Sequence, residues 1–180
     1  MSCWQQRQSS NTLLGVKVVI LIVGPSGSGK TALSGFLKEM GFQEFVSVTT
    51  RKPRQGEVDG TSYHFLTEEQ FDQLEKENAL AEKVEYRGNK YGVTLEEVEQ
   101  KSKNGDCYCV VDRQGMRQFK SKFSEAKVVF ITAPIETLIS RMYSRGDSEG
   151  AVKSRLNGIV EEATPVYEAD CIIYNNYSLE

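Results

Sequence analysis

Apolar residues along this chain fall into short segments of two kinds. Runs rich in β-branched and other apolar residues predict buried strands at residues 17–23, 45–49, 107–111, 127–131 and 171–174. Apolar residues spaced three and four positions apart predict helices at residues 30–40, 67–80, 94–103, 134–145 and 149–163. Because strands and helices alternate, the pattern predicts an α/β protein whose three-layer core has a parallel sheet between helices.

The segment from residue 47 to residue 93 departs from this alternation. It contains a polar, turn-rich stretch at 51–60 and short aromatic pieces at 63–65 and 86–91. A segment this long with few periodic apolar residues is not expected to supply strands or helices of the core. We therefore expect residues 46–93 to form a small substrate-binding lobe attached to the core.

Length and composition predict one globular domain. The chain has 180 residues, of which 39% are hydrophobic and 26% are charged, as is usual for a domain with a core of its own. We expect residues 17–180 to form this domain and the largely polar residues 1–16 to form a flexible N-terminal arm.

Charge and hydropathy exclude several classes of partner. The net charge of −3 gives no global basic field that would attract nucleic acid. The longest purely apolar run, residues 18–23, is too short to cross a membrane, and residues 1–11 hold no apolar signal core. We therefore expect a cytoplasmic protein that binds neither nucleic acid nor membrane.

The cysteines are not arranged as a metal site. None of them forms a C-x-x-C pair, and the single histidine cannot complete a zinc site. We expect all four to be buried, reduced thiols, namely Cys3, Cys107, Cys109 and Cys171.

Residues 24–31 read GPSGSGKT and match the phosphate-binding pattern G-x-x-x-x-G-K-[ST] without a mismatch. They follow the predicted strand 17–23 and lead into the predicted helix 30–40. Glycines let backbone N–H groups approach phosphate oxygens, and the helix N-terminus favours anions. A simple glycine-rich turn is the alternative, but the strand before and the helix after favour a nucleotide phosphate site.

Each residue type in this loop has a chemical use. Lys30 offers a mobile positive charge to the β- and γ-phosphates, and the hydroxyl of Thr31 is a ligand for Mg²⁺. The sequence therefore predicts a site for nucleotide phosphates with Mg²⁺, and its residues are expected to be Gly24, Pro25, Ser26, Gly27, Ser28, Gly29, Lys30, Thr31 and Ala32.

Further motifs, in the same order and spacing, closely resemble the signature of guanylate kinases. Residues 47–65 read SVTTRKPRQGEVDGTSYHF, and Glu82 precedes GNKYG at 88–92. DRQG follows at 112–115, then arginines at 141, 145 and 155, and a late strand that ends in Asn175. The resemblance covers residues 17–175. It implies a P-loop kinase core with a small GMP-binding lobe at 46–93 and a helical lid at 138–156.

The resemblance also implies a reaction. ATP and GMP give ADP and GDP with Mg²⁺, a step of purine nucleotide metabolism. Arg51 and Arg54 lie three residues apart, and arginine binds phosphate oxygens bidentately. By resemblance they hold the GMP phosphate together with the hydroxyls of Tyr63 and Tyr91. A solvated basic turn is the alternative.

Glu82 is implied as the reader of the guanine base. A carboxylate can accept hydrogen bonds from both guanine N1–H and N2–H₂, whereas adenine has no such pair of donors. Ser47 and Asp112 would complete base recognition. The acidic run 82–85 leaves Glu85 as a competing candidate. The alternative for Glu82 is an exposed charge at a helix end with no role in binding.

Asp112 follows the predicted strand 107–111, at the sheet edge where ligands bind. It is expected to serve guanine, the magnesium shell or both, because Val110 stands where the family often has a second acid. Val93 likewise stands where the family usually has a hydroxyl residue.

The lid arginines are implied in catalysis. Arg141 and Arg145 share one helix face at i,i+4 spacing, and Arg155 follows on the next helix. With Lys30 they would neutralise the transferred phosphoryl group. No general base is needed, because the acceptor phosphate is already anionic. A solvated arginine face is the alternative for each of the three.

Two rival functions share part of this pattern. A ribose-bisphosphate phosphokinase has a similar phosphate loop but needs no guanine reader. A peptide-binding module like the kinase-homology domains of synaptic scaffolds has a degenerate loop, whereas this loop is intact. The expected partners are therefore the small molecules ATP and GMP, and the oligomeric state stays open between a monomer and a homo-oligomer.

Overall fold

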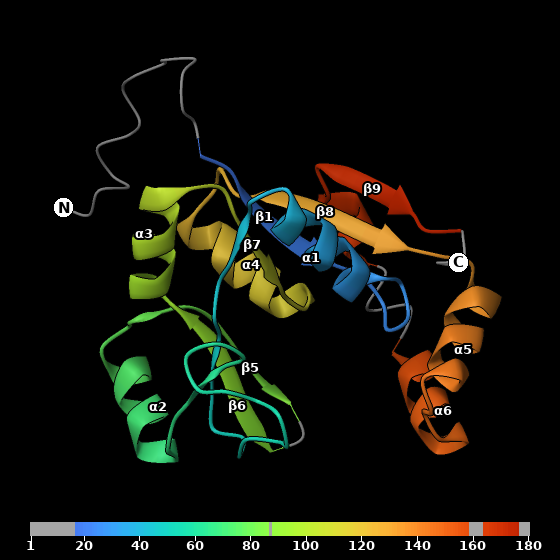
Figure 1. Ribbon diagram of the computed structural model, residues 1–180, viewed down its shortest axis with the longest axis horizontal. Coiled ribbons are helices and arrows are strands. Elements are labelled where there is room, and N and C mark those ends of the chain that lie inside the picture. Colours follow the sequence, from blue (N-terminus) through green and yellow to red (C-terminus); the bar gives the residue numbers. More distant parts are fainter. Residues whose placement is uncertain (1–16, 87, 159–163, 177–180) are drawn as a thin grey trace.

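The core of the protein is a five-stranded sheet with the strand order β2-β7-β1-β8-β9 (Figure 1). The computed structural model describes residues 17–86, 88–158 and 164–176. Every pairing in this sheet is parallel. In chain order its strands are β1 (Val19–Val23), β2 (Gln43–Glu44), β7 (Cys107–Val110), β8 (Lys127–Thr132) and β9 (Cys171–Tyr174).

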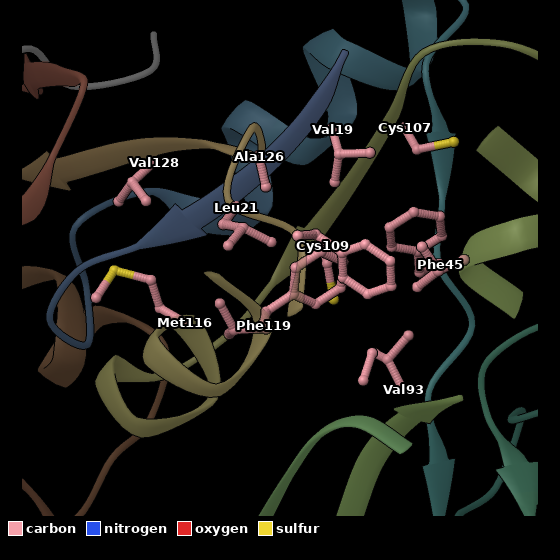
Figure 2. Close-up of a cluster of buried hydrophobic side chains, with 14 of the residues drawn as sticks. Val19, Leu21, Phe45, Val93, Cys107, Cys109, Met116, Phe119, Ala126 and Val128 are labelled. Carbon is pink, nitrogen blue, oxygen red and sulfur yellow. The ribbon is translucent and has the colours of Figure 1, made fainter. Parts of the chain in front are cut away.

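Helices cover both faces of this sheet, so the predicted three-layer α/β core is confirmed. On one face α1 (Lys30–Glu39) contributes Leu37 to a buried cluster with residues of β1, β7 and β8. On the other face lie α3 (Leu95–Asn104) and α4 (Arg113–Lys122). Figure 2 shows the cluster on that side, in which the rings of Phe45 and Phe119 stack 6.1 Å apart.

A second sheet has the order β4-β3-β6-β5. Its strands are β3 (Val48–Thr49), β4 (His64–Phe65), β5 (Leu80–Tyr86) and β6 (Asn89–Thr94), and α2 (Glu68–Lys76) packs Phe71 against it. The prediction that this region supplies no core element is wrong, because Ala81 and Val93 are buried in the main core. The predicted strand 45–49 is confirmed only for Val48–Thr49, which form β3 of the second sheet, because the chain leaves the first sheet after β2.

The helix α4 is an element that the sequence analysis did not predict. Its signal was present in Met116, Phe119 and Phe123, which follow the helix cap Asp112 at helical spacing and are all buried. Gly115 and a largely polar composition weaken the pattern, so tertiary packing rather than local propensity decides this helix.

Two short helices extend from the core at the end away from the second sheet (Figure 1). They are α5 (Ile135–Ser144) and α6 (Glu149–Asn157), and they share a small apolar cluster that includes Leu138, Met142 and Val152. The predicted helix 149–163 ends earlier than expected, and residues 159–163 lie outside the described residues. A 3₁₀ helix, η2 (Thr164–Glu168), leads into β9.

The cysteines are only partly as predicted. Cys107 and Cys109 are buried in β7, but Cys171 is exposed because β9 is an edge strand, and Cys3 lies outside the described residues. Within the described part of the chain, no helix combines the length and the apolar character that a membrane crossing requires.

Candidate active site

The phosphate-binding loop connects the carboxyl end of β1 to the first turn of α1. Gly29 caps α1 with a left-handed backbone, at a φ of 106°, which a residue with a Cβ adopts only with strain. At Gly24 an added Cβ would lie 2.0 Å from the carbonyl oxygen of Ile131. The loop therefore needs glycine both for its conformation and for its close contact with β8.

Lys30 folds back over this loop. Its Nζ donates to the carbonyl oxygens of Gly24, at 2.6 Å, and Pro25, at 3.0 Å. A cavity of about 780 Å³ opens beside the ammonium group. The cavity is lined by Ser26, Gly27, Gly29, Lys30, Thr31, Ala32, Arg141, Arg145, Asp147 and Arg155. The structure thus brings the loop and all three predicted lid arginines around one space.

Arg141 of α5 is tied to the loop and to the end of β9. It donates to the carbonyl oxygen of Gly27 at 3.3 Å and to that of Asn175 at 3.2 Å. The amide of Asn175 in turn donates to the carbonyl oxygen of Ser28 at 2.9 Å. The last strand therefore positions both the phosphate-binding loop and the first lid arginine.

Arg145 and Arg155 meet at two shared acceptors. Each donates to Ser26 Oγ at 2.8 Å, and each reaches Asp147 Oδ2, at 2.6 Å and 2.9 Å respectively. Asp147 is a site residue that the sequence analysis missed. Its signal was an acid placed two residues after Arg145, at the junction of the two lid helices.

Arg51 lies in a second cluster, within the sheet of β3 to β6. Its guanidinium group is 5.3 Å from the ring centroid of Tyr63, whose ring meets that of Tyr91 edge-on at 6.1 Å. Glu57 forms an ion pair with Arg51 at 2.8 Å. Arg54 has an exposed side chain, but its backbone N–H donates to the same Glu57 at 2.8 Å. Ring contacts join the other three predicted phosphate ligands.

Glu82 is the buried acid of the site. A β-bulge at Ala81 interrupts the alternation of β5, so Leu80, Ala81 and Glu82 are all buried. The side chain of Glu82 is 5% exposed, and burial, reinforced by the nearby Asp112, raises its pKa to about 8, although the N–H of Val93 donates to it. Its rival Glu85 is exposed.

Asp112 faces Glu82 across the first turn of α4. It caps that helix by accepting a hydrogen bond from the Gly115 N–H at 2.7 Å. A Cβ added to Gly115 would lie 2.7 Å from Glu82 Oε2 and 3.3 Å from Asp112 Oδ1. The two carboxylates therefore converge on a position that only glycine leaves open.

Two further cavities connect these clusters. One of about 470 Å³ is lined by Lys30, Arg155 and Asp112, among others. Another of about 270 Å³ is lined by Ser47 and Tyr63, and Val110 borders both. The phosphate-binding loop and Asp112 thus border one cavity at the carboxyl edge of the parallel sheet.

The loop cavity offers a protein hydroxyl that could meet a metal ion bound to phosphates. No group of three His, Cys, Asp or Glu side chains in the described ranges could hold an ion. Thr31 is exposed in the first turn of α1 and lines the loop cavity. Because Mg²⁺ keeps water and phosphate ligands, one protein hydroxyl beside a triphosphate site is enough.

Comparison with known proteins agrees with this geometry. The guanylate kinase family model matches residues 16–180. The guanylate kinase of Synechocystis sp. is 40% identical over 88% of this chain and 85% of its own length. That of Lactococcus lactis is 38% identical over 88% and 80%. A crystal structure of guanylate kinase from Anaplasma phagocytophilum superposes with a TM-score of 0.67 at 27% identity, covering 90% of this chain and 78% of that one. The chain therefore belongs to the guanylate kinase family.

Proposed function

We propose that this chain transfers the terminal phosphoryl group of ATP to GMP, giving ADP and GDP. One observation carries the proposal beyond family membership. A single cavity is lined both by Lys30 of the phosphate-binding loop and by Asp112, which lies beside the buried Glu82. This shared cavity supports a site in which donor phosphates and a purine-reading carboxylate lie within reach of one substrate pair.

The donor end binds ATP. The loop from Gly24 to Ala32 holds the phosphates through backbone N–H groups and the α1 N-terminus. Lys30, Arg141, Arg145 and Arg155 offset the charge of the phosphoryl group in transit. Thr31 would hold Mg²⁺, which when bound adds positive charge at the phosphates.

The acceptor end binds GMP. Arg51, Arg54, Tyr63 and Tyr91 hold its phosphate. The exposed side chain of Arg54 would reach the phosphate from the turn that Glu57 holds. Ser47, Glu82 and Asp112 read the base: the ionised Glu82 accepts from guanine N1–H and N2–H₂, whereas adenine leaves that buried carboxylate unpaired.

Catalysis is a matter of position and charge. The acceptor phosphate is already anionic, so in-line placement replaces a general base. The GMP-binding lobe (residues 46–93) and the lid (residues 138–156) close on the core and exclude water. The partners are small nucleotides of the cytoplasmic purine pool.

A coupled assay for ADP tests this function directly. With ATP and Mg²⁺, GMP is expected to be used with a kcat/KM at least about 10³-fold above that of AMP, because AMP leaves Glu82 unpaired. Ribose 1,5-bisphosphate serves as the control for the rival phosphokinase. Equal use of AMP, or preference for the ribose bisphosphate, would contradict the proposal, and ADP formation that ignores GMP would contradict it too.

Replacing Gly115 by alanine tests the convergence of the two carboxylates. Alanine favours the helix by about 1 kcal/mol, but its Cβ would lie 2.7 Å from Glu82 Oε2. The carboxylate moves aside, so we expect stability to be maintained and KM for GMP to rise by roughly tenfold or more.

Steady-state kinetics with each substrate varied, together with thermal unfolding, give the result. The matched control is Gly150→Ala in α6, where an added Cβ meets nothing within 4 Å. An unchanged KM for GMP in Gly115→Ala would show that Glu82 does not read the base from this position.

A further inference from the structure

Glu57 binds one edge of the Arg51 guanidinium group through both of its carboxylate oxygens. Arg51 Nη1 donates to Glu57 Oε2 at 3.0 Å, and Nη2 donates to Oε1 at 2.8 Å. The same Oε2 accepts from the backbone N–H of Arg54 at 2.8 Å. The two side chains are only 13% and 20% exposed. One carboxylate thus fixes an arginine and the turn that carries the second arginine.

Further contacts hold the guanidinium group of Arg51 in place. Nη1 also donates to the carbonyl oxygen of Lys52 at 2.8 Å, so both protons of that nitrogen are engaged. The rings of Tyr63 and Phe65 lie 5.3 Å and 5.9 Å from the guanidinium carbon. Hydrogen bonds with Glu57 and then Tyr91 raise the pKa of Arg51, and Arg51 lowers that of Glu57.

With these contacts in place, one edge of the Arg51 guanidinium group remains for a ligand. A guanidinium group has two forks that can each meet an oxyanion bidentately, and Glu57 occupies the Nη1–Nη2 fork. The opposite edge carries Nε and the second proton of Nη2. The ring of Tyr63 lies under the same guanidinium group and meets the ring of Tyr91 edge-on, so two phenols lie beside this arginine.

We propose that Glu57 is a positioning residue for the acceptor phosphate, holding Arg51 by one fork so that its other edge meets the phosphate beside Tyr63 and Tyr91. This inference rests on the proposed function, because it takes the Arg51 cluster as the GMP phosphate site. Glu57 acts through Arg51 and does not itself touch the substrate. Its negative charge opposes the phosphate, so its contribution is one of orientation and not of attraction.

Two alternative roles of Glu57 predict different changes in ligand affinity when this residue is replaced. If Glu57 merely occupied Arg51 until a phosphate displaced it, removing its charge would strengthen GMP binding. If Glu57 merely stabilised the fold of the whole lobe, its loss would weaken the binding of the nucleoside as much as that of the nucleotide. Positioning of the phosphate alone predicts a loss for GMP and none for guanosine.

Calorimetric titration of Glu57→Gln with GMP and with guanosine decides between these. We expect the affinity for GMP to fall about tenfold, the affinity for guanosine to stay unchanged, and KM for GMP to rise while kcat and KM for ATP hold. Glu77→Gln, an exposed acid at the end of α2 in the same lobe, is the charge-matched control and should change nothing.

The outcomes separate this inference from the function on which it rests. Tighter GMP binding by Glu57→Gln, an equal loss of guanosine, or no loss at all would overturn the positioning role. Arg51→Ala reports on the site itself: if it binds GMP as the unmodified chain does, the phosphate site is misplaced. Should Glu57→Gln fail to fold, Glu57→Asp keeps the charge but withdraws the carboxylate, and the same selective loss of GMP is expected.

Discussion

Replacing Glu82 by glutamine is expected to lower kcat/KM for GMP by roughly 30- to 1000-fold while making the ligand-free protein more stable in alkaline solution. Glutamine keeps the shape of the side chain, but its NH₂ group faces the N–H donors of guanine. One charge-assisted hydrogen bond is lost and two donors are set against each other. The same change removes a carboxyl group whose charged form is disfavoured by burial.

The direction of the stability effect follows from the pKa of Glu82. Its value is about 8 in the folded protein against an ordinary 4.5, so between these limits the folded state holds a proton that the unfolded state has lost. Stability is therefore full below the lower value and declines as pH rises through the higher one. At pH 9 the penalty is on the order of a few kcal/mol, and glutamine escapes it.

Thermal unfolding of both proteins at about pH 5 and about pH 9 measures this effect. The advantage of Glu82→Gln in melting temperature is expected to grow by several degrees between the two. KM for GMP of the unmodified chain is expected to improve as pH rises toward 8, because guanine needs the ionised acid. Glu85→Gln, an exposed change three residues away, is the control. If it carried the loss of GMP activity, the guanine reader would be Glu85.

Lys30→Met is expected to keep the fold and to lower kcat by about 10²-fold or more. Methionine matches the length of lysine without its charge. The ammonium group donates to the carbonyl oxygens of Gly24 and Pro25 in the loop, and Lys30 is not part of the buried core clusters. The charge has its main effect on the transferred phosphoryl group, so KM for GMP is expected to change little.

Lys38→Met provides the matched control for this variant. Lys38 is exposed in the last turn of the same helix, far from the loop cavity. Single-turnover rates and melting temperatures of both variants give the comparison. Activity of Lys30→Met within a factor of about three of the unmodified chain would count against the role of Lys30 in phosphoryl transfer.

The parts of this protein that the sequence predicts well are those with strong local signals. The loop at 24–31, the buried strands β1, β7 and β8, and the helix α1 each have a pattern complete within a few residues. The five-stranded parallel core follows from these. The second sheet does not, because its strands β3 and β4 have two residues each, too few to show any period.

In the candidate site too, the residues within local motifs are predicted well and those that depend on tertiary contacts are not. Residue types in motifs point to phosphate and guanine, but the choice between Glu82 and Glu85 depends on burial, which a bulge at Ala81 and the packing of α4 create. Neither is visible in the local pattern. Glu57 and Asp147 were missed as partners of arginines for the same reason: their function depends on contacts and not on a motif.

The shared acceptors of the lid have a consequence for its energetics. Arg145 and Arg155 both bind Asp147 Oδ2 and Ser26 Oγ, so removing either arginine leaves the carboxylate paired with the other, and only the double change removes both of these ion pairs. Their free energies are therefore coupled rather than additive. The two lid helices respond as a single thermodynamic unit. A substitution at either arginine changes the contribution of the other to the free energy of unfolding.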